Sequence, residues 1–178
     1  MRISILGCGW LGLPLAEHFS GKGMQVKGSV RDIEKKTALL NAGIEAYVIN
    51  IANKLQGENI DPFFDTDLLI INYPPPKADN AEKLHVQQLA EITGRLANPG
   101  AKVVFVSSTS VYPNTNGWVT EECNLLPEKG SGMVLLAAEK FLVNALGNKV
   151  TILRFGGLIG YTRNPARFLA GSKRQKKR

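Results

Sequence analysis

The chain has 178 residues, of which 44% are hydrophobic and 21% are charged. This length allows one domain with a sizeable core, and the composition is ordinary for a soluble globular protein. No apolar run approaches the roughly 18 residues of a membrane helix, so no membrane partner is expected. Two cysteines are too few for a disulfide framework and favour a reducing, cytoplasmic compartment.

The net charge of +7 is concentrated at the C-terminus, where residues 173–178 carry five positive charges. Without these residues the chain has 17 basic and 15 acidic residues, so its body is nearly neutral. A terminal run of charge is usually a solvated tail. The sequence therefore predicts one domain over residues 1–171, a basic tail over residues 172–178, and no nucleic-acid partner.

Six short segments rich in β-branched residues are nearly continuous in apolar residues, as strands buried on both faces are. They are Arg2–Leu6, Gln25–Val30, Glu45–Asn50, Asp67–Asn72, Lys102–Ser107 and Lys149–Phe155. Helical patterns separate them over residues 11–20, 32–41, 81–97 and 131–146. This alternation predicts an α/β fold with three α/β/α layers. Its centre would be a doubly wound parallel sheet with strand order 3-2-1-4-5-6.

Ligands in such sheets bind outside the carboxyl ends of the strands. The candidate cofactor contacts at the later strand ends are Asn50, Ile51, Tyr73, Pro74 and Ser107. Two long segments without periodicity, residues 72–80 and 112–130, follow strand ends on the same side. Loops of this length in a compact domain are usually functional or disordered.

The first strand runs into Gly7-Cys8-Gly9-Trp10-Leu11-Gly12, a G-x-G-x-x-G motif that opens a helix. Gly7 would form the tight turn, Gly9 would let the backbone approach a pyrophosphate, and Gly12 would let the helix pack against the strand. The amides of Trp10, Leu11 and Gly12 would then hold the phosphates. The alternative is a strand-to-helix turn without a ligand. Cys8 is expected to be a small, unreactive residue.

Arg31 follows the second strand, 19 residues after Gly12, where an arginine accommodates the 2′-phosphate of NADP. Lys35 lies on the next helix and is a further candidate contact. Asp32 is the complication, because an acid at this position can bind the ribose of NAD. We interpret Asp32 as a helix cap instead. The expected cofactor is therefore NADP, with NAD as the alternative.

Six segments of the chain resemble, in the same order, the extended and atypical short-chain dehydrogenases/reductases. They are ILGCGWLGLPLA, INYPPP, VVFVSSTSVYP, WVTEECNLLP, AAEKFLV and TILRFGGLIG. This is the NAD-dependent epimerase/dehydratase group, which includes nucleotide-sugar epimerases. The resemblance implies a Rossmann fold and a small-molecule substrate such as a nucleotide sugar or another carbonyl compound. It also implies pairing of two copies through the fourth and fifth helices.

The resemblance implies a catalytic serine after the fifth strand, followed by a tyrosine and then a lysine four residues later on a helix. It places Ser108 at the serine position, with Thr109 as a near alternative. Ser131 then stands where the tyrosine should be and Leu135 where the lysine should be, and neither can replace those groups. The catalytic candidates are therefore Ser108 and Tyr112, and no metal site is expected.

Two functions remain open from the sequence. One is an NAD(P)-dependent oxidoreductase without the C-terminal substrate lobe into which the family continues after TILRFGGLIG. The other is a catalytically silent dinucleotide-binding sensor or interaction module. Both predict cofactor binding, so only turnover separates them.

Overall fold

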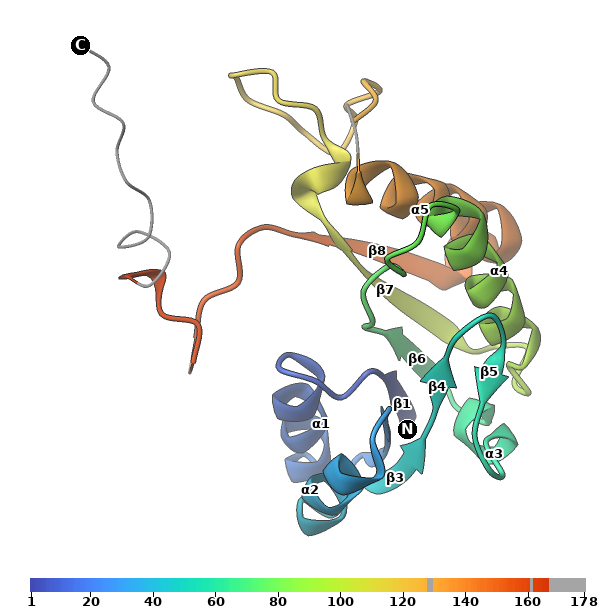
Figure 1. Ribbon diagram of the computed structural model, residues 1–178. Coiled ribbons are helices and arrows are strands. Elements are labelled where there is room, and N and C mark those ends of the chain that lie inside the picture. The colour runs from blue at the N-terminus through green and yellow to red at the C-terminus, as the bar shows by residue number, and fades with distance from the viewer. Residues whose placement is uncertain (128–129, 161, 167–178) are drawn as a thin grey trace.

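The computed structural model describes residues 1–127, 130–160 and 162–166, which form a three-layer α/β/α domain (Figure 1). Its central sheet has six parallel strands in the order β3-β2-β1-β6-β7-β8, which confirms the predicted doubly wound order. The strands are β1 (Arg2–Leu6), β2 (Gln25–Val30), β3 (Glu45–Val48), β6 (Leu68–Ile71), β7 (Lys102–Ser108) and β8 (Val150–Phe155).

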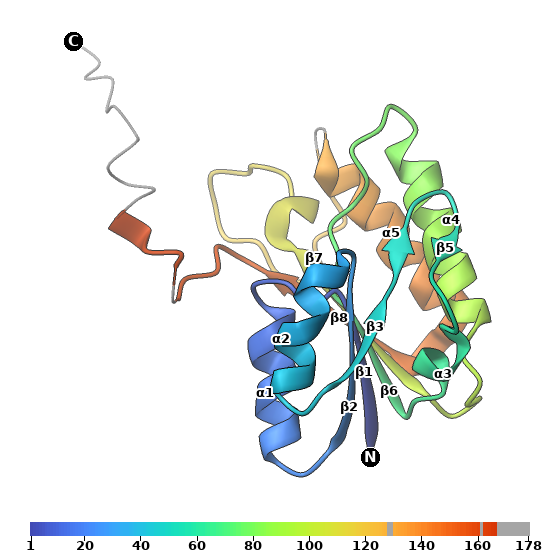
Figure 2. The same cartoon turned by 60° about the horizontal axis from the view of Figure 1, so that its bottom comes forward.

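The helices divide between the two faces of the sheet (Figures 1 and 2). One face carries α1 (Gly12–Gly21) and α2 (Lys36–Asn41), and the other carries α3 (Asp61–Phe64), α4 (Ala81–Gly94) and α5 (Ser131–Leu146). Alternate strand residues face opposite layers. Ile3 and Ile5 belong to the core under α1 and α2, whereas Leu6 belongs to the core under α4 and α5. Burial on both faces explains why the strands are nearly continuous apolar runs.

The third strand is shorter than the sequence predicted. It ends at Val48, because Asn50–Ile51 (β4) leaves the sheet and pairs antiparallel with Leu55–Gln56 (β5). The predicted helix over residues 81–97 likewise stops at Gly94. Both differences are at element ends, where a local turn or cap decides the boundary.

The segment after β2 begins as one 3₁₀ turn, Ile33–Lys35, before α2. Asp32 occupies the position before this turn, but its side chain accepts no hydrogen bond from the turn's amides. Its carboxylate instead pairs with Lys35 at 3.0 Å. The prediction that the Asp32 side chain caps the helix is therefore wrong, because an ion pair one turn away holds the carboxylate.

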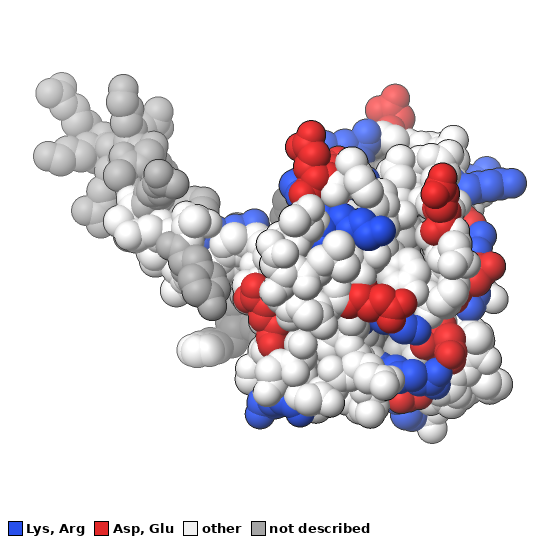
Figure 3. Space-filling model, turned by 90° about the horizontal axis from the view of Figure 1, so that it is seen from below, with Lys and Arg blue, Asp and Glu red and all other residues white. Residues whose placement is uncertain are grey.

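Acidic and basic side chains are interspersed on the face shown in Figure 3, without a large patch of one sign. The predicted domain boundary at residue 171 and the basic tail lie outside the described residues. Within the described ranges no helix has the length and apolar character needed to cross a membrane. The same ranges contain no cluster of three or more acidic, histidine or cysteine side chains that could hold a metal ion.

Candidate functional site

The glycine loop between β1 and α1 is packed so closely that two of its positions require glycine. Gly7 has a φ of +105°, and a Cβ there would lie 2.3 Å from the carbonyl oxygen of Asn72. A Cβ on Gly12 would lie 2.3 Å from the carbonyl oxygen of Gly7. The start of α1 therefore lies directly against the end of β1, which is the close packing expected of this motif.

Neighbouring strands hold the loop in place. The Asn72 side-chain amide, just after β6, donates to the Gly7 carbonyl at 3.0 Å. On the other side the Gly7 amide donates to Ser29 Oγ at 3.0 Å, and the Cys8 amide donates to the Ser29 carbonyl at 2.7 Å. Asn72 and Ser29 were not singled out from the sequence. For Asn72, a polar side chain at the end of an apolar strand could have indicated a role in holding the loop.

The opposite side of the loop is open. A Cβ on Gly9 would meet no atom within 4 Å. The amides of Trp10 and Leu11 donate to no acceptor in the part of the chain that the structure describes. Helix α1 also begins without a side-chain cap and has no acidic residue in its first turn. Unpaired amides at a helix N-terminus form an anion-binding site, because the helix dipole adds partial positive charge.

Cys8 is a structural member of the loop. Its side chain is 7% exposed and lies against Gly28, where a Cβ would approach Cys8 Sγ to 2.9 Å. Burial raises the pKa of this thiol to about 12, so the reactive thiolate is not populated near neutral pH. The prediction of an unreactive cysteine agrees with this environment.

Arg31 directly follows β2 and is exposed on the same edge as the loop. It makes no ion pair within the described ranges, whereas Lys35 is paired with Asp32. The hydrogen bond from Lys35 holds the pKa of Asp32 below its usual range, so Asp32 remains charged. Arg31 is therefore a cation at this strand end that forms no ion pair with a described residue, and the charge of the neighbouring Asp32 is held by Lys35.

The cofactor contacts predicted after β3 and β6 differ in how exposed they are and in the element to which they belong. Asn50 and Ile51 belong to the β4–β5 hairpin, and Pro74 is exposed after β6. The Tyr73 ring turns inward and meets the buried His85 ring of α4 edge-to-face, with centroids 5.2 Å apart. Burial raises the pKa of Tyr73 and lowers the pKa of His85.

Both rings carry an unpaired polar atom. Tyr73 Oη and His85 Nε2 are buried without a partner among the described residues. His85 Nδ1 lies 3.3 Å from Gln88 Oε1, and the Gln88 amide nitrogen donates to the Ala52 carbonyl at 2.7 Å. Gln88 Oε1 is thus the acceptor, so the Nδ1 of a neutral His85 carries the proton.

A buried polar network occupies the β7–α5–β8 end of the sheet. Ser107 Oγ, predicted as a cofactor contact, donates to Glu139 Oε1 at 2.5 Å. Arg154 on β8 donates to both Glu139 oxygens, the shortest contact being 2.6 Å. It also donates to Tyr112 Oη at 2.8 Å, with its guanidinium 4.9 Å from that ring centroid. These contacts satisfy the charge of Glu139, which is only 3% exposed.

Glu139 and Arg154 were not identified from the sequence. The spacing of Glu139 on α5 could have identified it, because it places this residue on the same helix face as the buried Leu135 and Leu142. A glutamate on an apolar stripe indicates a buried partner. Leu135, at the position of the family's lysine, faces the core, and Ser131 opens the helix.

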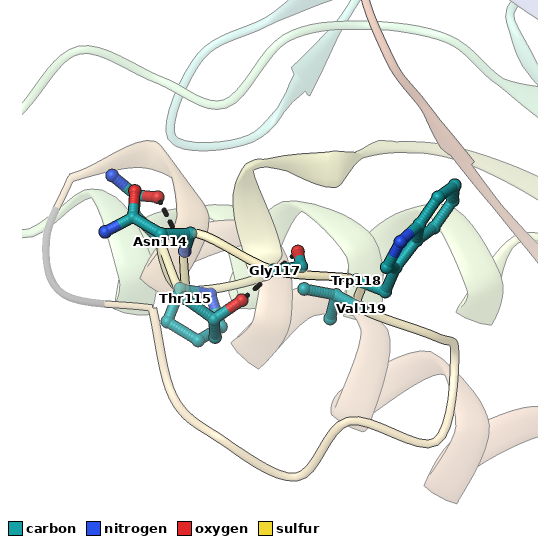
Figure 4. Close-up of a pocket in the computed structure, with 7 residues that line it drawn as sticks. Asn114, Thr115, Gly117, Trp118 and Val119 are labelled. Atoms are coloured by element: carbon teal, nitrogen blue, oxygen red, sulfur yellow. Dashed lines mark hydrogen bonds between the residues drawn. The ribbon is translucent and has the colours of Figure 1, made fainter.

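The remaining catalytic candidate, Ser108, ends β7, and its Oγ accepts from the Ser110 amide at 3.1 Å. The irregular segment that follows encloses a shallow hollow lined by Pro113–Val119, which contain no titratable side chain. Trp118 is fully exposed at this hollow and its ring points away from the other lining residues (Figure 4). The hollow therefore offers no acid or base for catalysis.

No family model matches the chain. It is 36% identical over 173 residues to Protein YeeZ of Escherichia coli (strain K12), covering 96% of this chain and 63% of YeeZ. It is 31% identical over 143 residues to the UDP-N-acetyl-D-glucosamine 6-dehydrogenase of Salmonella typhi, covering 75% of this chain and 32% of that enzyme. The chain thus spans less than two thirds of the length of these curated relatives.

Solved structures share the fold at low sequence identity. The Bacillus cereus UDP-glucuronic acid 4-epimerase in complex with NAD matches with a TM-score of 0.70 and 19% identity, over 93% of this chain and 60% of the epimerase. MoeE5 in complex with UDP-glucose and NAD matches with a TM-score of 0.71 and 20% identity, over 96% of this chain and 59% of MoeE5. The chain therefore has the Rossmann fold found in NAD-dependent epimerases.

Proposed function

We propose that the chain binds a nicotinamide dinucleotide at the carboxyl edge of its sheet, with NADP preferred over NAD. In this proposal it is the cofactor-binding part of an epimerase/dehydratase-like oxidoreductase. The substrate would be a small molecule, a nucleotide sugar or another carbonyl compound. The observation that carries the proposal is the glycine loop, which is rigidly held on one side and open at Gly9 on the other. NAD in the structures of the epimerase and MoeE5 supports the choice of ligand.

The residues present fit such a ligand. The amides of Trp10, Leu11 and Gly12 would bind the pyrophosphate, since no carboxylate in the first turn of α1 competes with it. Arg31 would bind the 2′-phosphate. Bound nicotinamide supplies hydride transfer, and the chain's own residues orient the dinucleotide along the strand ends.

Catalytic roles for Ser108 and Tyr112 remain proposals. Tyr112 is the phenol near the end of β7, but Arg154 and the network around Glu139 hold its hydroxyl. Leu135 in the core provides no cation for a catalytic phenol. These contacts favour the second candidate, a dinucleotide-binding module with little turnover. Pairing of two copies through α4 and α5 is part of either proposal.

Binding is tested by placing a side chain at the open position of the loop. A Cβ at Gly9 would meet no atom within 4 Å, so the Gly9→Val variant should fold normally and lose NADPH affinity. Gly21→Val, at the far end of α1 and also in open space, is the matched control. Fluorescence titration with NADPH and thermal unfolding measure both properties. Equal affinity of Gly9→Val and the unmodified chain would contradict the assignment.

Turnover separates the two candidate functions. NADPH oxidation is measured with a panel of nucleotide sugars, ketones and aldehydes. We expect little activity, since general acid catalysis typically contributes about 10²–10⁴-fold and no phenol–lysine pair is present at Ser131 and Leu135. Rapid turnover would contradict the silent module and favour an enzyme that uses Tyr112 or Ser108.

A further inference from the structure

The segment that follows β8 contacts the glycine loop, although it is far from the G-x-G-x-x-G motif in the sequence. It leaves the sheet beside the start of α1 (Figures 1 and 2). Within it, Gly160 and Arg163 exchange two backbone hydrogen bonds, of 2.6 and 3.3 Å. This closure places the Arg163 guanidinium 4.3 Å from the centroid of the Trp10 ring. Gly160 lies at the edge of the same ring, where a Cβ would be 3.7 Å from Trp10 Cζ2.

The contact brings a full positive charge to a loop that has only uncharged donors. Arginine over the face of a tryptophan within about 6 Å is held by cation–π attraction. Trp10 also supplies one of the two unpaired amides at the start of α1. Its indole Nε1 is buried without a partner among the described residues. A dianionic pyrophosphate at these amides would therefore bind the backbone of the same residue whose ring holds the Arg163 charge.

We propose that Arg163 is a pyrophosphate-binding residue of the dinucleotide site, positioned by the Trp10 ring. The proposal rests on the proposed function and adds a cation supplied from beyond β8. Arg31 would interact with the 2′-phosphate, which only NADP has. Arg163 would interact with the pyrophosphate, which NAD and NADP share. Loss of Arg163 should therefore weaken the binding of NAD and NADP equally, whereas loss of Arg31 should weaken the binding of NADP alone.

The test uses a Trp118→Phe background. The chain has two tryptophans, so this change leaves Trp10 as the single tryptophan whose emission is followed. Trp118 is fully exposed and outside the proposed site. In this background, Arg163→Ala, Arg163→Lys and Lys22→Ala are titrated with NADH and NADPH at several salt concentrations. Lys22 directly follows the last residue of α1, about 15 Å from the loop for a ten-residue helix. Its removal is therefore a control for net charge.

We expect Arg163→Ala to weaken NADH and NADPH each by about tenfold or more, the effect of a lost charge-assisted contact to phosphate. The salt dependence of binding should fall in the same variant. Arg163→Lys should retain part of the affinity, and Lys22→Ala should retain all of it. Trp10 emission should shift in Arg163→Ala without any cofactor, because the ring loses its cover.

The outcomes are distinguishable. A shifted Trp10 emission with unchanged affinity for both cofactors would overturn the role of Arg163 and leave the proposed function standing. A loss confined to NADPH would also overturn it, because Arg163 would then act on the 2′-phosphate. If the unmodified chain binds neither cofactor, the proposed function itself fails and the role of Arg163 falls with it.

Discussion

Polar groups in two regions of the sheet's carboxyl edge differ in whether they have partners. We call the region around β1 and α1 the ligand end and the region around β7 and β8 the saturated end. Around β1 and α1, the amides of Trp10 and Leu11 have no acceptor in the described part of the chain, and a Cβ on the preceding Gly9 would meet open space. Around β7 and β8, Glu139 and Arg154 satisfy each other and bind Ser107 and Tyr112 as well. Unused hydrogen-bonding capacity indicates where a ligand binds, and saturated buried charge indicates where the fold is held together.

The energetic reason is solvent access. Exposed amides at a helix start are solvated by water, so leaving them unpaired costs little until a ligand replaces the water. Glu139 is 3% exposed, and a carboxylate so deeply buried requires partners. Catalytic roles at the second end would require groups released from this network, whereas binding at the first end requires no rearrangement.

The largest expected effect is on the saturated end. Glu139→Ala leaves Arg154 without its carboxylate partner, and breaking such a buried pair costs about 3–5 kcal/mol. Urea unfolding measures the loss. Lys140→Ala, the exposed neighbour on the same helix, should change stability by less than about 0.5 kcal/mol. A similar small change for both variants would show that the network is not structural.

The next largest effect is on cofactor affinity at the ligand end. Arg31→Ala should weaken NADPH binding by about tenfold or more, because a charge-assisted contact contributes about 1.5–3 kcal/mol. NADH affinity should change little. Lys35→Ala should lose less NADPH affinity than Arg31→Ala, since Lys35 is already paired with Asp32 at 3.0 Å. Equal losses of NADH and NADPH in Arg31→Ala, measured by fluorescence titration, would indicate a structural role for Arg31.

Gly12→Ala should affect folding as well as binding, in contrast to Gly9→Val. Its Cβ would lie 2.3 Å from the Gly7 carbonyl, and such overpacking costs about 1–3 kcal/mol. Gly94→Ala, at the last residue of α4 with open space around its Cβ, is the control. Urea unfolding and NADPH titration of both variants test the difference. An unchanged stability for Gly12→Ala would contradict the close packing of the loop.

The smallest effect concerns acid stability. Burial lowers the pKa of His85 below its ordinary 6.5, so the unfolded chain binds a proton that the folded chain does not. Stability should therefore fall as the pH falls below 6.5, by at most about 1.4 kcal/mol per pH unit from this group. His85→Asn should flatten the dependence between pH 6.5 and 5. Urea unfolding at these pH values measures the difference, and an equally steep dependence in His85→Asn and the unmodified chain would contradict the account.

Most of the fold could be predicted because its signals are local or repeated. Strands such as β1 and β6 are apolar on both faces, and the glycine motif fixes the first strand-to-helix turn. Boundaries were less accurate. The predicted strand ran through Asn50, yet pairing of Asn50–Ile51 with Leu55–Gln56 takes these residues out of the central sheet.

The polar interactions could be predicted less well, because they depend on partners distant in sequence. Glu139 and Arg154 are 15 residues apart and meet only after α5 packs on β8. Arg163 meets Trp10 from the opposite end of the chain. Sequence patterns identify which face of an element is buried, but the packing of the elements decides which charges meet.

The most direct test of the account is residue-resolved amide hydrogen exchange, measured by NMR with and without saturating NADPH. The amides of Trp10 and Leu11 have no acceptor among the described residues, so they should exchange rapidly in the free chain and slow markedly when NADPH binds. The amides of Ser107 and Ser108 should change little. Slowed exchange at Ser107 and Ser108 with no change at Trp10 and Leu11 would contradict the claim that the glycine loop is the ligand end.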